Sequence, residues 1–130
     1  MSEATVGSEM SRSVLTIEPG RTLREAAHAM TKSKVGAVVV IDPEQPGPGI
    51  VTERDISHAV GEGLDPGAER VGDHTSTNAA YATPDWPLDE AVDSMRDGGF
   101  RHLVVIDGTD LVGIVSMRDV VRRWSQDRRG

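Results

Sequence analysis

An eight-residue pattern occurs twice in this chain. Residues 49–56 read GIVTERDI and residues 113–120 read GIVSMRDV, so a hydroxyl residue, an arginine and an aspartate recur at matching places. A shift of 65 residues also aligns VGSEMS (6–11) with VGDHTS (71–76), LREAAHAM (23–30) with LDEAVDSM (88–95), and AVVVID (37–42) with HLVVID (102–107). A repeat this extensive predicts two copies of one small structural unit.

Composition restricts the class of protein. The chain has 130 residues, a net charge of −7 and no cysteine. The negative charge disfavours binding to nucleic acid or an anionic membrane, and the lack of cysteine excludes disulfides and thiolate metal sites. The polar start of the chain lacks the apolar core of a signal peptide, and no apolar run is long enough to span a membrane. We therefore expect a cytoplasmic protein that is not embedded in a membrane.

Hydrophobic spacing predicts the same order of elements in each half. A short extended piece, a helix, a strand, a turn, a second strand and a second helix follow one another, which gives a βαββα unit of mixed α/β (α+β) class. In the first half these fall at 14–17, from Leu23 after a Thr22 cap, at 38–41, at 49–51 and from Thr52; in the second half they fall at 79–82, from Leu88, at 102–106, at 111–115 and from Met117.

About 60 residues are too few for a comfortable independent core. We therefore expect the two units to pack sheet to sheet around a pseudo-two-fold axis. The predicted division is a first repeat at 6–62, a linker at 63–70, a second repeat at 71–124, and flexible ends at 1–5 and 125–130.

A tandem of such units, each closing with ID followed by GIV, a hydroxyl residue and an aspartate three residues later, resembles a pair of cystathionine β-synthase (CBS) domains, also called a Bateman module. The resemblance covers about residues 6–124 and is closest to small stand-alone bacterial proteins of this kind. It implies an adenosyl ligand between the two repeats, such as AMP, ADP, ATP or S-adenosylmethionine, and a homodimer formed through helices.

The repeated hydroxyl and aspartate have two interpretations. A Thr-x-x-Asp pattern is a capping box that satisfies the first backbone N–H groups of a helix. The resemblance adds that the aspartate binds ribose hydroxyls, which makes Asp55 and Asp119 candidate ligand residues, with Thr52 and Ser116 beside them. The two roles are compatible, because a capped helix start can also border a ligand site.

The residues before each central strand differ between the repeats. The family often has a basic pair there that contacts ligand phosphates, and Arg101 and His102 match this pattern. Gly36 and Ala37 stand at the equivalent positions and offer space and backbone instead of charge. We therefore expect unequal sites, with any phosphate near the second repeat. For His102, a half-buried strand histidine without a ligand role remains the alternative.

Adenine recognition in the family uses apolar side chains and backbone amides of the short first strand and the central strand of each repeat. The matching residues are Thr16 and Ile17 in the first repeat, and Tyr81 and Ala82 in the second. Tyr81 could stack on a base or fill the pocket itself, and the sequence leaves both open.

The resulting hypothesis is a non-enzymatic regulatory sensor that requires no cofactor and acts on an unknown protein partner in trans. The four histidines show no metal-ligand spacing, and no catalytic motif is present. The alternative is a dimeric protein–protein interaction scaffold with vestigial nucleotide pockets, in which the two aspartates are helix caps alone.

Overall fold

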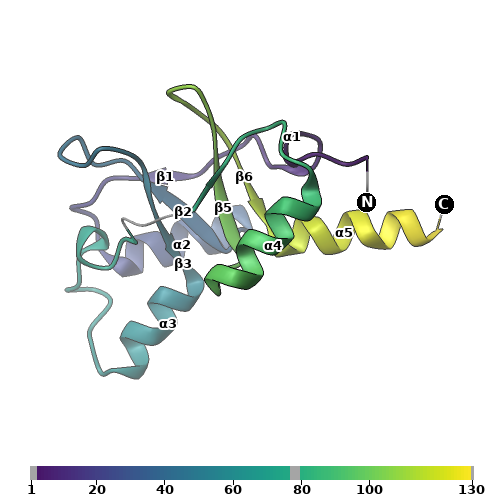
Figure 1. Cartoon of the computed structure of the whole chain (residues 1–130). Coiled ribbons are helices and arrows are strands. Elements are labelled where there is room, and N and C mark those ends of the chain that lie inside the picture. The colour runs from purple at the N-terminus through teal and green to yellow at the C-terminus, as the bar shows by residue number, and fades with distance from the viewer. Residues whose placement is uncertain (1–2, 77–79, 130) are drawn as a thin grey trace. The chain divides into compact units, whose positions relative to one another are not determined.

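The computed structural model describes residues 3–76 and 80–129 and divides the chain into two compact units (Figure 1). One unit contains residues 15–76, and the other combines the residues before 15 with those from 80 onward. Each unit has one three-stranded sheet and helices. The predicted α+β class and the βαββα order in each half are confirmed.

The unit of residues 15–76 contains one sheet of strand order β1-β2-β3. The edge strand β1 is parallel to β2, and β2 is antiparallel to β3. Its elements are β1 (Thr16–Ile17), α2 (Leu23–Ser33), β2 (Ala37–Val40), β3 (Gly49–Thr52), α3 (Glu53–Gly61) and a 3-10 turn, η1 (Val71–Asp73).

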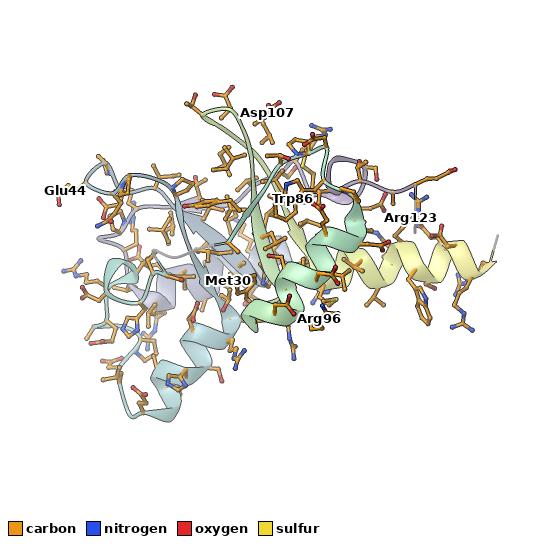
Figure 2. All side chains as sticks on the ribbon, in the orientation of Figure 1. Met30, Glu44, Trp86, Arg96, Asp107 and Arg123 are labelled. Carbon is orange, nitrogen blue, oxygen red and sulfur yellow. The ribbon has the colours of Figure 1, made fainter. Side chains whose placement is uncertain are left out.

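The other unit repeats this topology with strand order β4-β5-β6. Its hairpin of β5 and β6 is longer and contains a register shift between Val105 and Ile106. Asp107 lies at the turn of this hairpin (Figure 2). The elements are α1 (Val6–Glu9), β4 (Tyr81–Ala82), α4 (Leu88–Gly98), β5 (His102–Asp107), β6 (Asp110–Ser116) and α5 (Met117–Arg129).

Aliphatic side chains form a separate core in each unit. In the first, Leu23, Ala26 and Met30 of α2 pack with valines of β2 and β3. All four residues of β2 are buried, as expected for a strand covered on both faces. The predicted strand 38–41 lies one residue too late in the chain, since β2 spans Ala37–Val40. Ile41 lies beyond the end of β2 and is 45% exposed.

Local capping explains where the helices begin and end. The predicted cap at Thr22 is confirmed: its hydroxyl accepts from the Glu25 amide, and the Glu25 carboxylate accepts from the Thr22 amide. This amide and the Arg21 guanidinium hold the pKa of Glu25 below its ordinary value. The helices α2 and α4 end at residues in the left-handed region, Lys34 and Gly99, which is a common helix C-terminus.

Each compact unit is completed by the segment that begins the other repeat. The Val6 amide donates to the Trp86 carbonyl at 2.9 Å, and in the other unit the Val71 amide donates to the Arg21 carbonyl at 2.7 Å. Residues 6–11 therefore pack with the second repeat, and their counterparts at 71–76 pack with the first. The predicted bounds of 6–62 and 71–124 follow the sequence duplication, whereas the compact units follow these contacts.

Gly113, the glycine of the second GIV pattern, lies where residues 10 and 11 run beside strand β6. Ser11 forms a bridge to Ile114, and its amide donates to the Ile114 carbonyl at 2.8 Å. A Cβ atom on Gly113 would lie 2.8 Å from the Ser11 carbonyl oxygen and 2.7 Å from the Met10 sulfur. Only glycine permits so close an approach of two backbones at this position. At Gly49, the equivalent residue, a Cβ atom would clash with the Thr75 side chain and lie 3.2 Å from the Ser76 carbonyl oxygen.

The predicted flexible ends contain ordered structure. Ala4 is buried at 2% exposure, Thr5 caps α1, and α5 continues to Arg129. Residues 1, 2 and 130 of these ends, and residue 79 of the predicted extended piece, lie outside the described residues.

Candidate functional site

Thr52 and Asp55 form a complete capping box at the junction of β3 and α3. The Asp55 Oδ2 atom accepts from the Thr52 amide at 2.8 Å and from the Thr52 hydroxyl at 3.0 Å. The Asp55 amide donates in return to the Thr52 hydroxyl oxygen at 3.3 Å. The capping interpretation of this pair is therefore confirmed, and both side chains are only partly exposed.

Ser116 and Asp119 repeat this arrangement at the junction of β6 and α5. The Asp119 Oδ2 atom accepts from the Ser116 amide at 2.8 Å and from its hydroxyl at 3.0 Å. The Asp119 amide donates to the Ser116 hydroxyl oxygen at 3.2 Å. The two helix starts are thus built in the same way despite the change from threonine to serine.

Strand register brings the start of each central strand beside these caps. Ala37 pairs with Thr52 across β2 and β3, and His102 pairs with Ser116 across β5 and β6. The carbonyl of the preceding residue accepts from the first helix amide in both units, at 2.9 Å for Gly36 and Glu53 and at 2.9 Å for Arg101 and Met117. Two equivalent groups result, which we call the first cluster (Gly36, Ala37, Thr52, Asp55) and the second cluster (Arg101, His102, Ser116, Asp119).

The short edge strands lie farther along the sheets. Thr16 pairs with Val39, two positions beyond Ala37, and Tyr81 pairs with Val104, two positions beyond His102. At about 3.3 Å per strand residue, this is an offset of roughly 7 Å from the clusters. The structure therefore does not bring these edge-strand residues into direct register with the caps.

Exposure differs within the edge-strand pairs. Thr16 is exposed and Ile17 is partly buried, whereas Tyr81 is 39% exposed and Ala82 is buried at 2%. The Ala82 side chain packs in the core of its unit. It can therefore offer a ligand backbone groups more readily than side-chain contact.

The acceptor capacity of each aspartate determines what the clusters can bind. A carboxylate has about four acceptor positions, two on each oxygen. Within residues 3–76 and 80–129, Asp55 uses only its Oδ2 atom, so both positions on Oδ1 have no partner there. Two acceptor positions on one partly buried oxygen suit two adjacent hydroxyl groups.

Arg122 is the residue that sequence reasoning missed. Its Nη2 atom lies 3.1 Å from the Asp119 Oδ1 atom, in an ion pair between residues three apart on α5. The repeat alignment contained a signal for this difference, because Arg122 aligns with His58, which pairs with Glu62 instead.

The two clusters also differ in charge. Arg101 is exposed and His102 is partly buried at the start of β5, whereas Gly36 and Ala37 add no side-chain charge. In the described part of the chain no three histidines, cysteines or carboxylates are grouped as metal ligands. Among those same residues, no helix is both long and apolar enough to cross a membrane.

Comparison with known proteins identifies the family. The model of the CBS domain matches twice, at residues 5–62 and 71–125. The chain belongs to the CBS-domain family. The predicted resemblance to a tandem CBS pair is thereby confirmed, and the repeated βαββα units are its two CBS domains.

Individual CBS proteins resemble the chain over most of its length. A CBS domain-containing protein of Bacillus subtilis, YhcV, is 32% identical over 98% of this chain and 91% of its own length. An uncharacterized protein of Methanopyrus kandleri is 33% identical over 94% of the chain, which spans only 63% of that relative. The structure of the CBS domain protein PAE2072 from Pyrobaculum aerophilum, complexed with AMP, is 28% identical, covers 89% of both chains and superposes with a TM-score of 0.80.

Proposed function

We propose that this chain is a regulatory CBS module that binds an adenosine-containing ligand, with AMP, ADP, ATP and S-adenosylmethionine as the candidates. The observation that carries the proposal is the unpartnered Oδ1 atom of Asp55 among the described residues, beside a capped helix start. The repeats that carry the two clusters are proposed to span 6–62 and 71–124, joined by the linker 63–70. The AMP complex of PAE2072 supports the ligand class.

Each part of such a ligand has a matching group. The two Oδ1 acceptor positions of Asp55 suit the vicinal hydroxyls of ribose. The start of α3 adds the partial positive charge of the helix dipole, which favours an anionic group nearby. For a ligand bound at the second cluster, Arg101 and His102 add donors for its phosphate. The edge strands containing Thr16, Ile17, Tyr81 and Ala82 are proposed to contact the adenine.

The proposed output is regulatory and not catalytic. This proposal is supported by the capping boxes, in which the Thr52 and Ser116 hydroxyls each donate to an aspartate Oδ2 atom and accept from the amide of that aspartate. Ligand binding is proposed to be sensed by a protein partner in trans, in the cytoplasm. A homodimer is proposed through helix surfaces, since Val121 and Trp124 of α5 are 53% and 49% exposed.

A thermal unfolding panel tests this function against the scaffold alternative. The protein is melted with millimolar AMP, ADP, ATP or S-adenosylmethionine, with guanosine monophosphate as a control for the base. A ligand at ten times its Kd stabilises the folded state by about 1.4 kcal/mol, so at least one adenosyl compound should raise the Tm by several degrees. Unchanged Tm values with all four would favour the scaffold, and turnover of a bound nucleotide would contradict the non-enzymatic assignment.

A further inference from the structure

The two aspartates of the repeated pattern differ in how many acceptor positions remain. Both use Oδ2 for the capping box. The Asp119 Oδ1 atom also accepts from the Arg122 Nη2 atom at 3.1 Å, whereas the Asp55 Oδ1 atom has no partner in residues 3–76 and 80–129. One acceptor position therefore remains on the Asp119 Oδ1 atom, and two remain on that of Asp55.

The surroundings of the two helices explain this difference. Arg122 and His58 occupy the same position of the repeat, three residues after the aspartate. His58 interacts with Glu62, at 2.9 Å, in the next turn. The residue equivalent to Glu62 is Gln126, which carries no charge, and Arg122 pairs with Asp119 instead.

We propose that Arg122 is a specificity-determining positioning residue that competes with ribose for Asp119. This inference rests on the proposed function. A ribose with two hydroxyls binds Asp55 directly, but at Asp119 it must first displace the guanidinium. Asp119 is the less accessible partner, with its side chain 14% exposed against 55% for Arg122, so the mobile partner is the arginine. Ribose compounds without phosphate therefore favour the first cluster.

The test uses adenosine, which has the vicinal hydroxyls and no charge. Its binding is followed by NMR through the backbone amides of Asp55 and Asp119, which report the two clusters separately. The Arg122→His variant at pH 8, where histidine is mostly neutral, is expected to bind adenosine about two- to five-fold more tightly at the second cluster. That range corresponds to the strength of an exposed ion pair. Affinity at the first cluster should not change.

Three matched measurements distinguish competition from a structural effect. Arg122→Lys retains the cation and should behave like the wild type. The double variant His58→Arg with Glu62→Gln copies the second helix into the first and should weaken adenosine at Asp55 by a similar factor. Raising NaCl from 50 to 500 mM screens the ion pair, so it should tighten binding at the second cluster of the wild type and not of Arg122→His.

The outcomes separate this inference from the proposed function. If the wild type binds adenosine at the first cluster and Arg122→His leaves the second cluster unchanged or weaker, the competition is refuted while the proposed function stands. If only Arg122→His binds at the second cluster, the competition is supported. If neither protein binds at either cluster, the proposed function fails, and the competition fails with it.

Discussion

Replacing Val6 with aspartate is expected to destabilise the unit that contains the second repeat by about 3–5 kcal/mol. Val6 has 0% exposure and belongs to the core that includes Leu88 and Leu103. The substitution removes a buried side chain that contributes about 1.5–3 kcal/mol and leaves a carboxylate without a partner in an apolar core, which adds a further penalty. The backbone contact with Trp86 anchors the segment at the same point.

Hydrogen exchange shows which unit responds, because local opening is reported amide by amide. Amides of β5 and β6 should lose protection in Val6→Asp, although Val6 belongs to the first repeat by sequence. Val60→Asp is the matched control, since Val60 is 53% exposed on α3, and its cost should be within about 0.5 kcal/mol. Loss of protection in β2 and β3 instead would contradict the packing of residues 6–11 with the second repeat.

Replacing Asp55 with alanine is expected to weaken the adenosyl ligand by about 10- to 100-fold. A hydrogen bond to a charged group contributes about 1.5–3 kcal/mol, and 1.4 kcal/mol is a factor of ten in affinity. The variant also loses the capping box of α3, which costs about 1 kcal/mol of stability. Calorimetric titration with AMP measures the affinity, with folding checked beforehand.

Two further variants separate ligand binding from capping. Asp55→Asn retains an oxygen acceptor for the Thr52 amide but loses the charge, so it should keep most of the stability and still bind AMP more weakly. Glu53→Ala removes an exposed carboxylate from the same helical turn and should leave the affinity within about twofold. An Asp55→Ala protein that binds AMP like the wild type would show that this aspartate is a cap alone.

Features set by neighbouring residues were predictable from the sequence. The alternation of helix and strand, the Thr22 cap and the two capping boxes all depend on side chains within a few positions of one another. The duplication strengthened each prediction, because the capping pattern found at Thr52 occurs again at Ser116.

Features that depend on distant residues were not predictable. The placement of Val6 against Trp86 joins positions 80 residues apart, and no periodic pattern encodes it.

The pairing of Arg122 with Asp119 is local, but it depends on which neighbouring carboxylate is available, and the equivalent His58 pairs with Glu62 instead. The sequence shows that Gln126 replaces Glu62 at the equivalent position, but only the coordinates show that Arg122 pairs with Asp119.

The most direct test of the account is an NMR titration of the wild-type protein with AMP, followed through all backbone amides. The account predicts saturable shifts concentrated at Gly36, Ala37 and residues 52–55, and at Arg101, His102 and residues 116–119, with the β5–β6 turn at Asp107 unaffected. The absence of shifts at millimolar AMP, or saturable shifts confined to residues outside both clusters, would contradict it.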